Sequence, residues 1–468
     1  MNGSVTTLKV LVAIIALASA PLVLKRRWRL FLALPISAFQ IFLPGLSIAN
    51  TPIPVAFFGS LMLWPEFVRE FKVLVSWKPT VALLGIIAMY AVSLTWSPTP
   101  KLGLPPIGYT LQFLTIFAAT LAEARRNRPL VLRLLVVTLG FTLVQAVAVI
   151  VFRVMPGLKL TYLTSPLARF FISPKVVGQL FTTGVNNVVD PTKSGGILAV
   201  NANVGAIFLG MCAFVAAGLA LDLRKRWLAV LAVVFFTAIA FAGSKAALLI
   251  EVGLTIISLH IISMRITHWR VRTRVSMLAV VLLATIVWLT PKALSVSQGL
   301  EYKQLSLFAS RSQATLSTRE KIWAYGAKAF SEHPFLGQGF GGWQDDFPRY
   351  ARKVGLDPDL PPHNTIIYLW SQGSILAAIL GLWYIYGILN LGQRLVFNGE
   401  ISDLGINLGM SMAFLWLFLQ GMGENIGLVG DGAPLLAGLL AIGCVNRERM
   451  ADRVDQTIRR GITVSDVA

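Results

Sequence analysis

Long apolar segments follow one another along most of this sequence, separated by short polar connections. Each segment is about 16–25 residues long, which allows a helix to cross a hydrocarbon core of about 30 Å. Hydrophobic residues make up 56% of the 468-residue chain and charged residues only 13%, whereas a soluble protein of this size needs a more polar surface. The sequence therefore predicts an all-α polytopic membrane protein with about 12 to 13 transmembrane helices.

Lysine and arginine clusters in the short connections predict the topology. Clusters such as Lys25–Arg29 and Arg125–Arg128 belong on the cytoplasmic side by the positive-inside rule. This leaves two long connections, 153–196 and 291–362, on the periplasmic side. We treat the chain 1–468 as a single membrane domain, in which 153–196 is a basic loop and 291–362 is a large loop with short helices that caps the site of any chemistry.

The boundaries of the individual spans follow from the same pattern. The first apolar run is interpreted as a retained anchor, because its basic residues follow the apolar core instead of preceding it. The side of the N-terminus and the choice between 12 and 13 spans depend on how the first three runs are divided. The predicted spans lie near 8–24, 30–48, 52–66, 80–96, 105–122, 129–152, 197–221, 227–242, 245–264, 275–290, 364–389, 405–422 and 430–446.

The formal net charge of +20 limits the classes of partner. Most of it follows from the positive-inside rule and from attraction to membrane lipids. The basic residues are scattered between spans and form no aromatic–basic platform, so no nucleic-acid partner is expected. Cys212 and Cys444 are far apart in apolar runs, so neither a disulfide nor a metal site is predicted. In loop 153–196, basic residues outnumber the single acid Asp190, which indicates either an anionic ligand or a solvated loop.

A polar stretch from Ser317 to His363 interrupts the apolar pattern. Ser317 and Glu320 have the spacing of a capping box, and Pro334 ends the helical pattern that follows. The sequence thus predicts a short amphipathic helix over 318–332 with Arg319 in its first turn. Free backbone N–H groups and a guanidinium there favour a phosphate, although a solvated arginine at a helix start would have the same sequence.

His363 follows two prolines and opens the next apolar run. An imidazole at this position can accept a proton near neutral pH, as a general base must. An interfacial histidine without a catalytic role is the alternative. Lys245, at the outer end of its span, either anchors that span at the membrane surface or contacts a lipid phosphate.

Further polar groups are expected near the same surface. Asn201 and Asn203 start a span, where they contact a sugar or head group or cap the helix. Glu424 and Asp431 lie near the outer ends of the last two spans and can supply a carboxylate there. The glycines of 337–342 lack the preceding strand and the following lysine of a nucleotide-binding loop. We interpret them as a flexible turn.

The order of these motifs resembles the O-antigen ligase and polymerase superfamily. The resemblance covers roughly 196–381 and is most specific in the loop motifs. It runs from the asparagine segment and Ser244-Lys245 through Arg319-x-x-x-Trp323 and His333-Pro-x-x-Gly-x-Gly-Phe-Gly to His363-Asn364 and Gly373.

The resemblance implies a glycosyltransferase of the bacterial inner membrane, multi-pass, inverting, independent of metal and of any cofactor, with its active site facing the periplasm. The donor would be a glycan on undecaprenyl pyrophosphate, and the acceptor a lipid A–core sugar or another glycan. By motif position His363 would be the base, while Arg319 and Lys245 would bind the pyrophosphate. Asn201, Asn203, Trp323 and Asn364 are candidate substrate contacts.

Three functions remain open at this point. Many ligases have arginine where this chain has Lys245, and lysine is common among the exopolysaccharide polymerases of the superfamily, so ligase and polymerase both fit. A transporter of the same lipid-linked glycan would also need a basic cavity. It would not need a base at His363.

Overall fold

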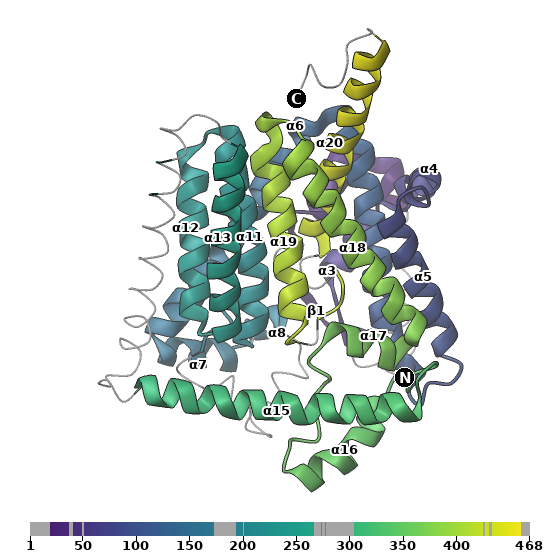
Figure 1. Cartoon of the computed structure of the whole chain (residues 1–468), viewed down its shortest axis with the longest axis vertical. Helices are drawn as coiled ribbons and strands as arrows, with labels where there is room; N and C mark the ends of the chain where they lie inside the picture. Colours follow the sequence, from purple (N-terminus) through teal and green to yellow (C-terminus); the bar gives the residue numbers. More distant parts are fainter. Residues whose placement is uncertain are drawn as a thin grey trace.

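Apolar helices packed side by side form the body of the protein in the computed structural model (Figure 1). The structure describes residues 19–36, 41–48, 51–172, 193–199, 201–265, 273, 277, 304–424, 426–429 and 433–459. Within these residues five helices are long and apolar enough to cross a membrane, or up to six if the bent pair Trp64–Leu74 and Lys78–Ser93 forms one span. The predicted all-α polytopic class is therefore confirmed. The count of about 12 to 13 spans stays a prediction, because 275–290 and most of 8–24 lie outside the described residues.

The elements occur in the following order along the chain. Two short 3₁₀ helices, Pro100–Gly103 and Ile401–Asp403, precede α6 and α19. The α-helices are α2 (Arg26–Ala33), α3 (Val55–Leu61), α4 (Trp64–Leu74), α5 (Lys78–Ser93), α6 (Leu104–Val154), α7 (Pro156–Thr164), α8 (Ala168–Phe171), α11 (Ala202–Leu223), α12 (Arg226–Ala242), α13 (Lys245–Arg265), α15 (Gln304–Glu332), α16 (Gly342–Val354), α17 (Thr365–Gly373), α18 (Ile375–Asn398), α19 (Leu404–Gly421) and α20 (Ala433–Arg459).

A short hairpin replaces part of two predicted spans. Strand β1 (Phe42–Ile48) pairs antiparallel with β2 (Thr51–Pro54), so the prediction of continuous helices over 30–48 and 52–66 is wrong. Pro44, Gly45, Pro52 and Pro54 disfavour a continuous helix here, because proline removes a backbone donor and glycine adds conformational entropy. Hydropathy alone does not detect these interruptions.

The long helix α6 is two spans joined by a break. Its 51 residues would extend about 77 Å if continuous, far more than a bilayer core. Asn127 has non-helical angles (φ −147°, ψ 68°), and Pro129 follows it. The two halves agree with the separate spans predicted at 105–122 and 129–152.

Glycines let α11 and α19 pack closely in the centre of the bundle. A Cβ atom at Gly218 would lie 2.2 Å from the carbonyl oxygen of Gly405, and one at Gly210 would lie 1.9 Å from the ring of Trp416. Close approach through small residues is a main source of helix association in membranes. This contact fixes the relative positions of Asn203, in the first turn of α11, and Glu424, just after α19.

The segment 193–199 is tied to the bundle immediately before α11. The side-chain amide of Gln145 donates to the carbonyl of Gly195 (2.7 Å) and accepts from the amides of Ile197 (2.8 Å) and Leu198 (3.0 Å). The hydroxyl of Tyr162 donates to the carbonyl of Ile197 at 2.8 Å. These bonds hold the start of α11 in a defined position although the segment itself is irregular.

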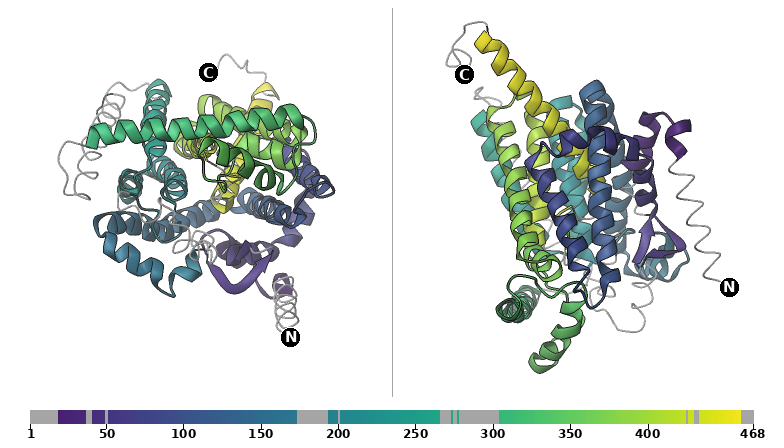
Figure 2. Two further views of the ribbon diagram at one scale, coloured as in Figure 1. Left: turned by 90° about the horizontal axis from the view of Figure 1, so that it is seen from below. Right: turned by 90° about the vertical axis from the view of Figure 1, so that its right-hand side faces the viewer.

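Helix α15 lies across one end of the bundle, with α16 below it (Figures 1 and 2). We call this the cap end. The opposite end, which we call the tail end, contains the α18–α19 connection, residues 399–403, and the projecting C-terminal part of α20 (Figure 1). Helix α13 runs from the cap end to the tail end. Its last residue, Arg265, donates to the carbonyl of Gly399 (2.6 Å) at the tail end, so its first residue, Lys245, lies at the cap end.

The predicted span 364–389 is interrupted between α17 and α18. Ser374 has a φ of +121° and caps α18, its hydroxyl accepting from the amide of Ala377 at 3.3 Å. The amide of Ile375 donates to the carbonyl of Phe335 at 3.0 Å. The break thus creates a point at which the α15–α16 connection is attached to the membrane helices.

The glycine turn at 337–342 is a packed connection, so the prediction that it is flexible is wrong. Gly337, Gly339 and Gly341 all have positive φ (68°, 72° and 92°), which glycine adopts at little cost. The turn bonds to α17 through the amide of Gln338 and the carbonyl of Ser371 (2.8 Å). It also bonds to the 97–99 connection through the amide of Phe340 and the Ser97 hydroxyl (2.7 Å). The glycines allow this close approach.

We expect Gly337→Ala to destabilise the protein much more than Gly355→Ala. Both glycines have nearly the same φ (68° and 70°), but a Cβ at Gly337 would lie 2.2 Å from the carbonyl oxygen of Trp370, and one at Gly355 meets nothing within 4 Å. The Gly355 variant should lose about 1–2 kcal/mol for the left-handed conformation alone, and the Gly337 variant roughly 3 kcal/mol or more. Thermal unfolding in detergent measures both, and equal losses would contradict the packed turn.

Candidate functional site

Four segments that are distant in sequence meet at one carboxylate on the cap end. Glu424 lies in the turn after α19, and 7% of its surface is exposed. Its Oε1 accepts from Asn203 Nδ2 at 2.7 Å and from Arg319 Nη2 at 2.8 Å. Its Oε2 lies 3.4 Å from His363 Nδ1. We call Asn203, Arg319, His363 and Glu424 the Glu424 cluster.

Arg319 reaches the cluster from the middle of α15. The predicted helix start at Ser317 is wrong, because α15 begins at Gln304 and continues through the capping-box residues without interruption. Arg319 therefore lacks the help of a helix N-terminus, and its binding properties come from its guanidinium alone. The guanidinium carbon lies 3.6 Å from the position that a Cβ of Gly423 would occupy, so the group packs against a backbone without a side chain.

His363 precedes α17 in a constrained conformation. Its φ of +49° is in the left-handed region, which is uncommon for residues other than glycine, although histidine is among those that adopt it more often. Asn364 caps α17, its Oδ1 accepting from the amides of Ile366 (2.9 Å) and Ile367 (3.1 Å). The cap on one side and Pro361-Pro362 on the other hold the imidazole beside Glu424. Its Nδ1 is buried and makes no hydrogen bond within the described structure, so the 3.4 Å separation is a close approach only.

The predicted asparagine contacts have different surroundings. Asn201 caps α11, because its side chain accepts from the amide of Asn203 at 2.8 Å, as its helix-capping interpretation predicts. Asn203 is a member of the Glu424 cluster. Asn364 caps α17 and also donates to the carbonyl of Met422 at 3.4 Å. The caps therefore position the chain around Glu424, and Asn203 contacts the carboxylate itself.

Lys245 and Trp323 also lie at the cap end. Lys245 is half-buried and begins α13. Trp323 lies one turn beyond Arg319 on α15, with 38% of its surface exposed. Their predicted contacts with a substrate stay predictions.

The sequence indicated Glu424 only as a possible carboxylate at this surface, and did not include it among the candidate site residues. Its signal in the sequence is that no other acid occurs between Asp403 and Asp431. Asp431 itself lies outside the described residues. Within the described part of the chain, no three His, Cys, Asp or Glu side chains are grouped closely enough to hold a metal ion.

The chemistry available to the cluster follows from its unused groups. Arginine carries five N–H donors, and Glu424 accepts one of them through Nη2, so the guanidinium retains donors for an anion such as phosphate. The carboxylate beside Nδ1 of His363 favours the tautomer and orientation in which Nε2 is the basic atom. Side-chain exposures of 19% for Arg319 and 21% for His363 leave both groups accessible.

The helices and this cluster define a polytopic membrane protein with a cation–carboxylate–imidazole site at one end of its bundle. Residues 230–382 match the protein family described as O-antigen ligase. The match extends from α12 into the start of α18 and contains Lys245, Arg319 and His363. It agrees with the resemblance to the O-antigen ligase and polymerase superfamily that the motif order indicates. Asn203 and Glu424 lie outside the matched residues. The curated proteins give no match to this chain.

We expect Glu424→Gln to destabilise the cap end more than Glu320→Gln. The first substitution removes the charge that pairs with Arg319 and should cost about 1–3 kcal/mol, because the guanidinium would remain largely buried without its counter-ion. Glu320 is exposed on α15, the helix that carries Arg319, and its substitution should change the stability of the protein little. Thermal unfolding of the two variants checks this. A Glu424 variant as stable as the Glu320 variant would argue against the cluster.

Proposed function

We propose that this protein is a glycosyltransferase that moves a glycan from undecaprenyl pyrophosphate to a sugar hydroxyl on the periplasmic side of the bacterial inner membrane. The observation that carries the proposal is that Arg319 and His363 contact the two oxygens of one carboxylate, Glu424. A guanidinium suited to bind phosphate and an imidazole suited to act as a base thus lie on either side of the Glu424 carboxylate. The match of residues 230–382 to the O-antigen ligase family supports a lipid-linked glycan as donor.

Arg319 would bind the pyrophosphate of the donor and stabilise it as a leaving group. The acceptor oxygen attacks the anomeric carbon, and the bond from that carbon to the pyrophosphate oxygen breaks with its electron pair staying on the pyrophosphate. A single displacement inverts the anomeric configuration. Because the pyrophosphate is already activated, the site must chiefly supply charge stabilisation and orientation, and no metal or cofactor is required by this scheme.

His363 would accept the proton of the acceptor hydroxyl at Nε2. The carboxylate of Glu424 on the opposite side of the ring stabilises the imidazolium that results, in the way a buried carboxylate assists a catalytic histidine. Asn203 donates to the same carboxylate and so holds it in place. Lys245, at the cap end, is a second cation suited to the lipid phosphate.

The acceptor that we propose is a lipid A–core sugar, which makes the protein an O-antigen ligase. Lys245 favours a second candidate, a polymerase of O-antigen or exopolysaccharide with the same site, because many ligases have arginine at this position, whereas lysine is common there among the exopolysaccharide polymerases of the superfamily. A transporter of the lipid-linked glycan is a third candidate, but it has no use for a base held against a carboxylate.

We expect His363→Ala to abolish transfer while the fold is retained. The purified full-length protein is supplied with carrier-linked glycan and acceptor, and product is measured directly. Removal of a general base typically lowers the rate by about 10²–10⁴-fold. His333→Ala is the matched control, because this histidine is exposed at the end of α15 and lies outside the cluster. Normal product formation by the His363 variant would exclude the proposed base.

Deletion of the gene in the native cell distinguishes ligase from polymerase. A ligase deletion should remove the glycan ladder from lipid A–core while long chains persist on the carrier, because polymerisation does not depend on it. A polymerase deletion should instead remove the long carrier-linked chains. Complementation with the His363→Ala variant is the control, since loss of the base should reproduce whichever defect the deletion shows.

A further inference from the structure

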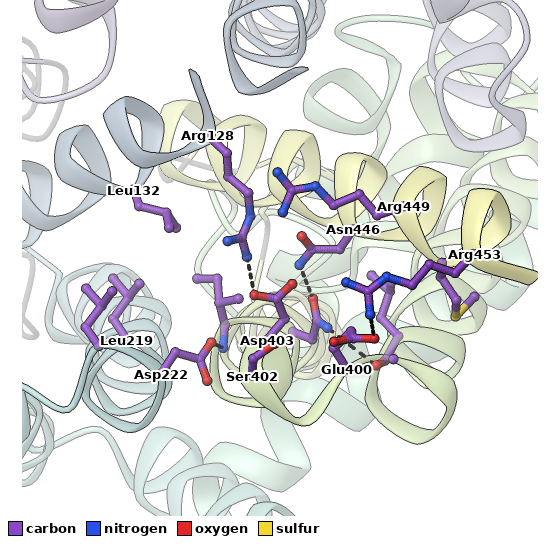
Figure 3. A pocket seen from close by; sticks show the side chains of 16 residues that line it. Arg128, Leu132, Leu219, Asp222, Glu400, Ser402, Asp403, Asn446, Arg449 and Arg453 are labelled. Atoms are coloured by element: carbon purple, nitrogen blue, oxygen red, sulfur yellow. Dashed lines mark hydrogen bonds and ion pairs between the residues drawn. The ribbon is translucent and has the colours of Figure 1, made fainter. Parts of the chain in front are cut away.

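A polar cavity lies at the tail end, at the opposite end of the bundle from the Glu424 cluster. Its volume is about 330 Å³, and α6, α11, α18, α19 and α20 all contribute to its wall. Figure 3 shows the charged side chains that meet there. Arg128 comes from the break in α6, Arg449 and Arg453 from α20, and Glu400 and Asp403 from the α18–α19 connection.

Two of the three arginines that line this cavity form ion pairs with acids of its wall. Arg128 pairs with Asp403 at 2.5 Å, and Arg453 pairs with Glu400. Within the described residues no acid pairs with Arg449.

The remaining acid, Asp222, is already satisfied. Its carboxylate oxygens accept from the amides of Gly405 and Ile406, both at 2.7 Å, so it caps the N-terminus of α19, whose dipole compensates the charge. The cavity therefore has three arginines and three carboxylates, and Arg449 is the arginine with which no acid pairs in the described part of the chain.

Two buried polar atoms in the wall have no partner within the described structure. They are Arg128 Nε, a donor, and Asn446 Oδ1, an acceptor. Asn446 is 6% exposed, and its Nδ2 donates to Asn407 Oδ1 at 2.8 Å, which orients Oδ1 away from that contact. Buried polar groups of this kind destabilise a protein when no ligand satisfies them. Arg128 Nε can donate to an anion, and Asn446 Oδ1 can accept from a hydroxyl or ammonium group.

We propose that this cavity binds the phosphate ester of a phospholipid head group. Arg449 and Arg128 Nε provide charge-assisted donors to phosphate oxygens, and Asn446 Oδ1 accepts from a head-group hydroxyl or ammonium. Leu132, Leu219 and Leu395 also line the cavity and offer apolar contact to the glycerol and the first acyl carbons. Basic pockets between transmembrane helices are suited to such head groups. The lysine and arginine clusters at this end are those that the positive-inside rule assigns to the cytoplasmic side.

To test this proposal, the full-length protein in detergent is titrated with dioctanoyl phosphatidylglycerol, and the thermal unfolding of the protein is measured. We expect saturable stabilisation of the wild type, and an apparent dissociation constant about tenfold larger for Arg449→Gln, because a charge-assisted contact is lost. Arg126→Gln is the matched control, since Arg126 is exposed at the same end but does not line the cavity. The variants should unfold at the same temperature as the wild type without lipid, which shows that each is folded.

Two further ligands distinguish the source of the phosphate. If inorganic phosphate stabilises the wild type but not Arg449→Gln, the cavity is a phosphate site whose ligand is a soluble anion. Dioctanoylglycerol, which lacks the phosphate, should not distinguish the wild type from Arg449→Gln. Equal stabilisation of the wild type and Arg449→Gln by phosphatidylglycerol would overturn the proposal.

Discussion

The cap end of this protein depends on the electrostatics of one carboxylate. A buried charge costs several kcal/mol unless it is paired and hydrogen-bonded, and Glu424 meets that requirement only by collecting partners from three other segments. Asn203 comes from α11 and Arg319 from α15, and His363 lies beside it ahead of α17. The need to satisfy a single charge thus fixes the relative positions of groups that are up to 221 residues apart.

The helix core makes this arrangement reproducible. Close packing of α11 against α19 through Gly218 and Gly405 sets where Asn203 and Glu424 lie before either side chain makes a bond. The cap at Asn364 and the prolines before His363 then limit the conformations of the histidine. In this structure backbone contacts in the membrane determine distances at the surface, and the side chains of the cluster need little adjustment of their own.

Much of this was predictable from the sequence, and the failures have physical causes. Hydropathy identified the helical class, and the order of motifs identified Arg319 and His363. The start of α15 was missed because Ser317 and Glu320 fit a capping box although the helix continues through them. The hairpin at 42–54 was missed because prolines and a glycine inside an apolar run do not lower its hydropathy enough. Glu424 was predicted only as a possible carboxylate at this surface, because the partners of a carboxylate are set by tertiary contacts between α11, α15 and α17.

The packed glycine turn also bears on how bulky substrates reach the cap end. Its backbone is bonded to Ser371 on α17 and to Ser97, and its close contacts leave no room for side chains. A hinged opening of α15 at this point would break all of these contacts together. Under the proposed function, a bulky glycan would therefore have to reach the Glu424 cluster while these contacts stay in place.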